Sequence, residues 1–238
     1  MKIDILAIGV HPDDVELSCS GTIMKHIALG KKVAILDLTL GELGTRGSAE
    51  LRTKEAMAAA KLQGVAFRKQ LQLKDGAFKN EDKSQIAIIE VIRECQPEIV
   101  LCNAISDRHP DHGRAAQLTA DACFYSGLIK IETSANGAKQ KAWRPKAVYH
   151  YIQDQYIKPN FVIDVTEFRD KKHEAIKAFA SQFYDPNSKE PETPISGKEF
   201  VDYIDAKMMI YGRSIGVKYA EGFTVSRYMG VKDLFDLI

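Results

Sequence analysis

Short runs of apolar residues alternate with helical segments over the first 145 residues of the chain. Four strand-like runs occupy residues 3–10, 33–40, 67–73 and 99–103. Most of these runs are apolar almost without interruption, which is typical of strands buried on both faces of a parallel sheet. Helical patterns fill the intervals, at residues 21–29, 49–62, 84–95 and 113–120. The alternation predicts an α/β fold of Rossmann-like type, with a mostly parallel sheet, right-handed crossovers and helices on both faces.

The pattern changes after about residue 145. Strands are expected at residues 147–152 and 161–165, and long helices at residues 166–183 and 198–212. The two helices are joined by a polar, proline-rich segment at residues 185–197, which is either a surface connection or a lid over a site.

The length of the chain bounds the number of domains. At 238 residues it fits one domain, large enough to bury roughly seven-tenths of its unfolded surface. We expect a single domain over residues 1–238, in which residues 1–145 form the Rossmann-like core and residues 146–238 complete the site.

Two short clusters of histidine and carboxylate residues follow strands of the predicted sheet. The first, His-Pro-Asp-Asp at residues 11–14, comes after the opening strand, and the second, His-Pro-Asp-His at residues 109–112, comes after the strand at residues 99–103. The carboxyl ends of parallel strands meet at one edge of a sheet, where ligands bind, so the two clusters can converge although they are distant in sequence.

The residue types in these clusters suit a catalytic zinc ion. Such an ion takes three protein ligands, usually histidines with a carboxylate, and keeps a fourth position for water. His11, Asp14 and His112 would supply two imidazoles and one carboxylate. Asp13 and His109 are then left beside the metal, and hydrolysis needs these residue types as general base and as acid or electrophilic partner.

Each cluster also has a purely structural interpretation, because His-Pro and Pro-Asp are common turn sequences and a lone His-x-x-Asp often caps a helix. The joint occurrence of both clusters at strand ends favours a metal site. His26, His150 and His173 have no ligand partners nearby in the sequence, so we expect them to lie outside it.

Composition excludes several other classes of protein. The 33 basic and 32 acidic residues give a net charge of +1, so neither nucleic acid nor an anionic membrane is an expected partner. No apolar run is long enough to span a bilayer, and the chain opens on a strand without a secretory leader pattern. The four cysteines are far apart and are expected to be reduced, which indicates a cytoplasmic protein.

With these motifs in order, the chain resembles the LmbE-like (PIG-L) zinc de-N-acetylases, which act on N-acetylglucosamine conjugates. The resemblance rests on the two clusters, on Gly-Thr at residues 21–22 and on the loop Gly-Glu-Leu-Gly-Thr-Arg-Gly at residues 41–47. Residues 158–165 and 216–223 are similar to the branch that includes the bacillithiol-biosynthesis deacetylases.

The resemblance implies roles for the site residues. It implies one zinc ion per chain, or another divalent ion, held by His11, Asp14 and His112, with Asp13 as the general base for the attacking water. His109 would stabilise the oxyanion or protonate the leaving amine, and Asp111 would orient it.

The resemblance also implies a substrate, N-acetylglucosaminyl-L-malate, a small-molecule sugar conjugate, and relatives that often form homo-oligomers. Arg46, Arg52 and Arg108 could pair with the malate carboxylates, because guanidinium groups bind carboxylates with two hydrogen bonds. The chain departs from some relatives in having Phe200 where they carry a tyrosine that assists the oxyanion, although Tyr203 lies close in sequence.

Two alternatives stay open. One is a nucleotide-binding or regulatory module in which the clusters hold a structural metal, although the chain lacks both common glycine-rich phosphate-binding motifs. The other is a zinc de-N-acetylase that acts on a different conjugate, such as a mycothiol-type or lipid-linked sugar, or on a small amide.

Overall fold

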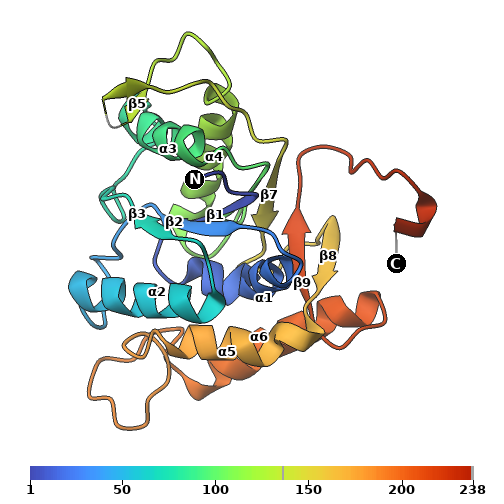
Figure 1. Ribbon diagram of the computed structural model, residues 1–238. Coiled ribbons are helices and arrows are strands. Elements are labelled where there is room, and N and C mark those ends of the chain that lie inside the picture. The colour runs from blue at the N-terminus through green and yellow to red at the C-terminus, as the bar shows by residue number, and fades with distance from the viewer. Residues whose placement is uncertain (136, 237–238) are drawn as a thin grey trace.

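The computed structural model describes residues 1–135 and 137–236 and is built around one mixed, mostly parallel sheet (Figure 1). Its strand order is β3-β2-β1-β4-β7-β9-β8. The first five strands in this order are parallel, and β9 runs antiparallel to both of its neighbours. The strand bounds are β1 Ile5–Gly9, β2 Val33–Asp37, β3 Arg68–Gln70, β4 Ile99–Cys102, β7 Ala147–Tyr151, β8 Phe161–Asp164 and β9 Ala220–Thr224. The short strands β5 (Ser134–Ala135) and β6 (Ala138–Lys139) form a separate hairpin. The predicted α/β architecture with a mostly parallel sheet is confirmed.

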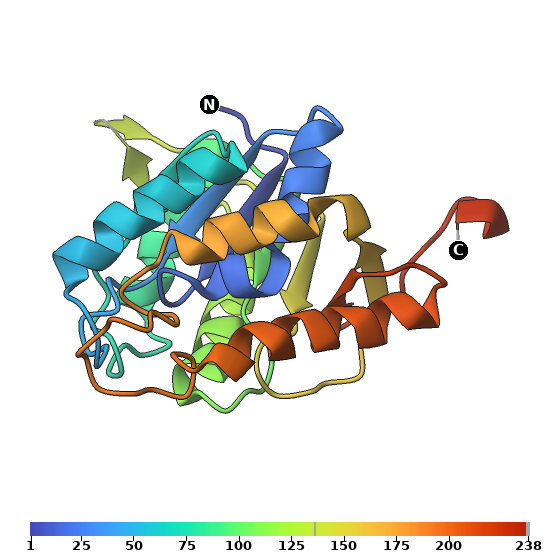
Figure 2. The ribbon, with the colours of Figure 1, turned by 90° about the horizontal axis from the view of Figure 1, so that it is seen from below.

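Helices cover both faces of this sheet. Helices α3 and α4 pack on one face, and α1 and α2 lie on the other, where α5 packs on the outer side of both; α6 lies against β9 and α5 (Figures 1 and 2). Their bounds are α1 Asp14–Ala28, α2 Ala49–Gln63, α3 Asp82–Cys95, α4 Pro110–Tyr125, α5 Arg169–Lys177 and α6 Lys198–Ser214. Two single 3₁₀ turns occupy Thr166–Phe168 and Leu234–Asp236.

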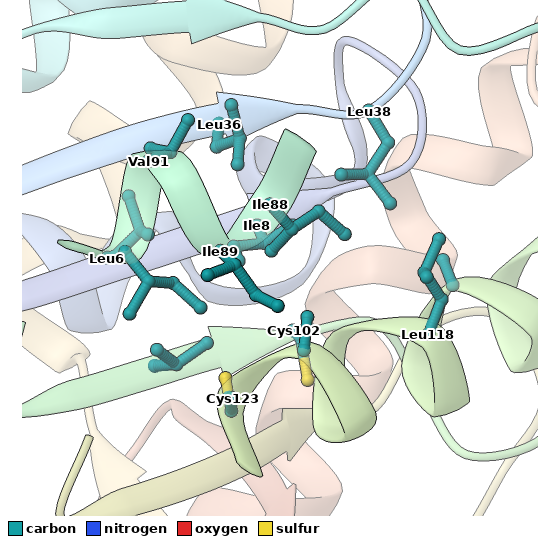
Figure 3. Packing of buried hydrophobic residues seen from close by; sticks show 14 of the residues in the cluster. Leu6, Ile8, Leu36, Leu38, Ile88, Ile89, Val91, Cys102, Leu118 and Cys123 are labelled. Atoms are coloured by element: carbon teal, nitrogen blue, oxygen red, sulfur yellow. The ribbon is translucent and has the colours of Figure 1, made fainter. Parts of the chain in front are cut away.

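The buried strands explain the continuous apolar runs of the sequence. In β1, Leu6 and Ile8 face α3 and α4, whereas Ile5 and Ala7 face α1 on the opposite side. Figure 3 shows Leu6 and Ile8 in one cluster with Ile88 and Ile89 of α3. Because successive side chains of a strand point to opposite faces, a strand covered on both faces needs apolar residues at every position.

The cysteines take part in this packing. All four are buried and free, and Cys102 and Cys123 lie in the cluster drawn in Figure 3. No disulfide therefore contributes to the fold of the described residues.

Helix α1 begins seven residues earlier than its apolar pattern predicts. It starts at Asp14, directly after the first strand, and is interrupted at Cys19, where φ is −142° and ψ is 15°. A start at residue 21 was wrong because the first turns carry buried polar residues, whose burial the apolar pattern does not reveal.

A buried ion pair satisfies the backbone at this interruption. The Glu221 carboxylate accepts hydrogen bonds from the amides of Gly21 and Thr22 at 3.0 and 2.7 Å. Lys172 Nζ donates to Glu221 Oε1 at 2.6 Å and to the carbonyl oxygen of Leu17 at 2.9 Å. The second half of α1 thus has a carboxylate at its amino end, where the helix dipole favours negative charge.

The C-terminal part was predicted less completely. The segment expected as one helix at residues 166–183 is a 3₁₀ turn followed by α5, which ends at Lys177. Strand β9 was not predicted, because Ala-Glu-Gly-Phe-Thr lacks the β-branched or alternating pattern of a strand. A Cβ atom at Gly222 would lie 3.0 Å from the ring of Tyr211, so this strand needs a glycine to pack against α6.

Among the helices of the described residues, none is both long enough and apolar enough to cross a bilayer.

Candidate metal and catalytic centre

A pocket of about 310 Å³ opens at the carboxyl ends of β1 and β4, where the two predicted clusters meet. Part of its lining comes from the N-terminal half of the chain, namely from both clusters and from the loop after β2. The rest comes from the C-terminal half, from residues 153–154 and 193–195 and from side chains of α6. The ring centroids of His11 and His109 are 4.8 Å apart, and those of His109 and His112 are 5.1 Å apart. The predicted convergence of the clusters is therefore confirmed.

Two histidines face one carboxylate at the base of this pocket. His112 Nε2 lies 3.2 Å from Asp14 Oδ1, and His11 Nδ1 lies 3.9 Å from Asp14 Oδ2. The other ring nitrogen of each histidine contacts a second carboxylate: His11 Nε2 lies 2.9 Å from Asp75 Oδ1, and His112 Nδ1 lies 2.6 Å from Asp107 Oδ2. Histidines that bind metals commonly have their second nitrogen held in this way, which fixes the tautomer and the ring orientation.

The donor set fits a divalent metal ion. Two ligands at about 2.0–2.2 Å from a tetrahedral zinc ion are roughly 3.3–3.6 Å apart. The distance of 3.2 Å between His112 and Asp14 is close to this range, and that of 3.9 Å between His11 and Asp14 is somewhat longer. Nitrogen donors of His11, His109 and His112 also lie within 4.8 Å of one another. A second group with the same spacing consists of His11, Asp75 and Asp111.

The charges of the cluster favour a cation as well. Burial alone would lower the pKa of His11, but the carboxylates of Asp111 and Asp75 outweigh it and raise the pKa to about 10. Burial acts the same way on His112, and there Asp14 and Asp107 raise the pKa to about 9. Positive charge is therefore stabilised at this point, and a divalent ion can supply it in place of protons.

The Asp14 carboxylate is held in its charged form. Oδ2 accepts hydrogen bonds of 2.9 Å from the amides of Val10 and His11 and from Asn103 Nδ2, and Oδ1 accepts one of 3.0 Å from Gln153 Nε2. Burial would raise the pKa of Asp14, but the charge of His112 and these hydrogen bonds hold it well below its usual range. A fixed carboxylate is the form that binds a metal.

Asp13 has a strained backbone that turns its side chain into the pocket. Its φ of 131° is one of only two positive values for non-glycine residues in the described part of the chain. Arg52 Nη2 donates to Asp13 Oδ2 at 2.9 Å. Burial raises the pKa of Asp13 to about 6 although Arg52 opposes the shift. Strain of this kind persists where the surroundings fix it, and it is common at functional sites.

His109 is the N-cap of α4, and its Nδ1 accepts a hydrogen bond of 3.3 Å from the backbone amide of Asp111. A neutral imidazole that accepts at Nδ1 carries its proton on Nε2. Burial, followed by the charges of His11 and His112, lowers the pKa of His109. The ring therefore presents a proton donor to the pocket without a permanent charge.

Asp111, which was expected to orient His109, contacts its ring through the backbone amide and not through the carboxylate. The Asp111 carboxylate accepts hydrogen bonds from the Gly76 amide at 2.9 Å and from Arg114 Nη1 at 2.7 Å, and it lies 3.7 Å from His11 Nε2. Only its backbone amide reaches His109. The physical reason is the helix start, which turns the residue after Pro110 away from the N-cap side chain.

The three predicted substrate arginines have different surroundings. Arg52 lines the pocket, but it binds Asp13 and the carbonyl oxygens of Pro12 and Gly41. Arg108 lines the pocket and pairs with Asp154 at 2.6 Å. Arg46 is not part of the pocket lining, because its guanidinium is buried against the carbonyl oxygen of Phe183 and the hydroxyl of Ser188.

Other segments singled out in the sequence also reach the pocket. Phe200 and Tyr203 both line it, and the hydroxyl of Tyr203 donates to the backbone oxygen of Asp154. Thr193, Pro194 and Ile195 form part of one wall, so the proline-rich segment contributes to the pocket.

Sequence reasoning missed the residues that orient the ligands, namely Asp75, Asp107, Asn103 and Gln153. Asp75 and Asp107 lie in loops, where an aspartate is an ordinary turn residue. Asn103 directly follows β4, so its position at the carboxyl edge of the sheet could have identified it.

Comparison with known proteins agrees with this geometry. The model of the PIG-L family, GlcNAc-PI de-N-acetylase, matches residues 6–123. Diacetylchitobiose deacetylase from Thermococcus kodakarensis is 30% identical over 92% of this chain and 81% of its own length. The probable N-acetyl-alpha-D-glucosaminyl L-malate deacetylase 2 of Bacillus anthracis is 27% identical over 75% of this chain and 81% of its own.

A solved structure extends the similarity to nearly the whole chain. The conserved protein TT1542 from Thermus thermophilus superimposes with a TM-score of 0.85 and 31% identity, and the match covers 97% of this chain and 98% of that protein. The chain therefore belongs to the LmbE-like (PIG-L) de-N-acetylase family and is a hydrolase of that family.

Proposed function

We propose that the protein is a metal-dependent hydrolase that removes the N-acetyl group from an N-acetylglucosamine conjugate. The observation that carries the proposal is the pair of histidines around Asp14, each with its second nitrogen on a carboxylate, beside Asp13 in the same pocket. In this proposal His11, Asp14 and His112 hold the metal, for which the nitrogen and oxygen donors suit zinc.

The chemistry divides between the metal and the protein. A bound zinc ion would polarise the amide carbonyl and lower the pKa of a water molecule to about 7. Asp13 accepts the proton of the attacking water, and Arg52 keeps its carboxylate pointed into the pocket. His109 donates a hydrogen bond from Nε2 to the developing oxyanion, and Asp13 passes the proton that it took from the water to the departing amine.

For the substrate we propose N-acetylglucosaminyl-L-malate, as in bacillithiol biosynthesis. Support comes from the relative in Bacillus anthracis and from the presence of cationic side chains in the pocket lining, since such groups bind carboxylates. The second candidate is N,N'-diacetylchitobiose, because the deacetylase of that name matches this chain over more of its length.

The test is acetate release from both candidates and from free N-acetylglucosamine, with protein as purified, chelated and reconstituted with zinc. We expect metal-dependent release with the malate conjugate as the preferred substrate. If diacetylchitobiose were preferred, the proposed de-N-acetylation would stand and the proposed malate substrate would be wrong. No acetate release from any of them by the zinc-loaded protein would overturn the proposal.

Variants separate the proposed roles. Asp13→Ala should keep stoichiometric zinc and lose about a hundredfold or more in kcat, because general acid–base catalysis contributes about that much. His112→Ala should lose the metal itself, as measured by metal analysis after dialysis.

His26→Ala is the matched control for these variants. Among the described residues the His26 side chain forms one hydrogen bond, to the carbonyl oxygen of Thr22, and it is not part of the pocket lining, so its loss should change neither zinc content nor rate. Normal turnover by Asp13→Ala would contradict the base assignment.

The proposal also covers the cellular compartment and the oligomeric state of the protein. We infer that the protein works in the cytoplasm, since all four cysteines are free and buried. Its assembly as a homo-oligomer stays a prediction from the family resemblance.

A further inference from the structure

Three cationic side chains line the pocket, and one of them differs from the other two. Arg52 pairs with Asp13 at 2.9 Å, and Arg108 pairs with Asp154 at 2.6 Å. Lys207, on α6, forms no ion pair with any carboxylate among the residues that the structure describes. Its one hydrogen bond there is to the backbone oxygen of Gln153.

The ammonium group of Lys207 is connected to the proposed metal centre through Gln153. Gln153, whose carbonyl oxygen it binds, places its own side-chain nitrogen 3.0 Å from Asp14 Oδ1 and 3.2 Å from His112 Nε2. Aromatic and aliphatic side chains of Tyr203 and Ile204 line the pocket around it, and its nitrogen lies 5.5 Å from the centre of the Tyr203 ring. The lysine is thus one residue away from the proposed ligands.

A cation in such surroundings needs a counter-charge. Removing an ammonium from water costs several kcal/mol unless an opposite charge and hydrogen bonds compensate it. A single carbonyl oxygen leaves two N–H donors of the ammonium to be satisfied. Since the nearby arginines are already paired, the charge that remains available inside the pocket belongs to Lys207.

We propose that Lys207 is a specificity-determining residue that binds a carboxylate on the aglycone of the substrate. The inference rests on the proposed function and deepens it. In an N-acetylglucosamine conjugate the aglycone is attached to the carbon next to the one that carries the acetamide. An amide at the metal centre therefore brings the aglycone close to it, within reach of a cation on the adjoining wall.

In this proposal Lys207, and not one of the three arginines, distinguishes an acidic conjugate from a neutral one. Arg46 is buried away from the pocket, and Arg52 is needed by Asp13. The Arg108 side chain is 50% exposed, so water and salt screen its charge. A pocket wall with a cation that forms no ion pair favours a substrate with the matching carboxylate, because a neutral substrate would cover the charge without compensating it.

The experiment compares two substrates, N-acetylglucosaminyl-L-malate and the neutral methyl glycoside of N-acetylglucosamine. In Lys207→Met we expect kcat/KM for the malate conjugate to fall by about tenfold to a hundredfold, mainly through KM, and to change far less for the neutral glycoside. Lys207→Arg keeps a cation and should retain most of the preference. Lys198→Met, an exposed lysine at the start of the same helix, is the matched control.

A binding measurement separates this inference from the proposed function. L-malate alone should bind the zinc-loaded wild-type protein in calorimetry and bind at least about tenfold more weakly to Lys207→Met. If the wild type released no acetate from either substrate, the proposed function would fail, while the malate titration would still decide the role of Lys207.

Two results would overturn the inference. Equal losses on both substrates would mean that Lys207 only supports Gln153 and the metal centre. Unchanged kinetics and unchanged malate binding in Lys207→Met would mean that another group binds the anion.

Discussion

At the scale of single residues, the carboxylates behind the histidines matter as much as the histidines. Asp107 accepts from the ring of His112 at 2.6 Å and also binds the backbone amide of Gln155 through its other oxygen. It therefore fixes the orientation of a proposed ligand and connects it to the segment that follows β7. Asp75 has the same relation to His11.

We predict that Asp107→Ala weakens zinc binding by about tenfold to a hundredfold while the fold is retained, since partners behind metal-binding histidines typically contribute that much. Competition with a chromophoric chelator measures the affinity. Asp202→Ala, an exposed aspartate on α6, should leave it unchanged. Equal affinities in the Asp107 variant and the wild type would mean that the ring is held by packing alone.

At the scale of secondary-structure elements, α1 depends on an ion pair from the C-terminal part of the chain. Lys172 and Glu221 are each about 1% exposed, and together they satisfy the backbone on both sides of the interruption at Cys19. Since α1 starts with Asp14, a displaced helix would move a proposed metal ligand.

Removing one partner of this pair should be costly because it leaves the other charge buried. We predict that Lys172→Met lowers the free energy of unfolding by about 3–5 kcal/mol, measured by urea titration. Lys69→Met, which breaks the exposed pair with Glu94, should cost less than about 1 kcal/mol. Similar losses in the two variants would show that burial of the pair has no special effect.

The same elements explain what the sequence could and could not predict. Strands β1 and β4 were predictable because both of their faces are buried, and the two histidine clusters because the carboxyl edge of a parallel sheet is the usual place for a site. The start of α1 and the whole of β9 were not, since Glu221 and Gly222 look polar or flexible until they meet partners from distant segments. Asp75 looks like an ordinary turn residue in the sequence, and Lys207 looks like any helix lysine until its contact with Gln153 places it at the pocket.

At the scale of the whole molecule, the N-terminal and C-terminal parts of the chain contribute different groups to the same pocket. The proposed ligands and Asp13 all lie within residues 6–123, the part matched by the family model. The opposite wall, with Gln153, Lys207 and residues 193–195, comes from the later part. In the proposed mechanism the catalytic groups therefore come from residues 6–123, and the groups that select the substrate come from both parts of the chain.

Metal binding should stabilise the entire domain, because the proposed ligands join the ends of two central strands. At a free zinc concentration a thousandfold above its Kd, the gain is about 4 kcal/mol. For a domain of this size each kcal/mol shifts Tm by about 2–4 °C, so chelation should lower Tm by roughly 8–16 °C. Differential scanning fluorimetry with and without chelator measures the shift. His112→Ala should show almost no change of Tm on chelation. A wild-type Tm that is the same with and without zinc would contradict a metal site that connects the two strands.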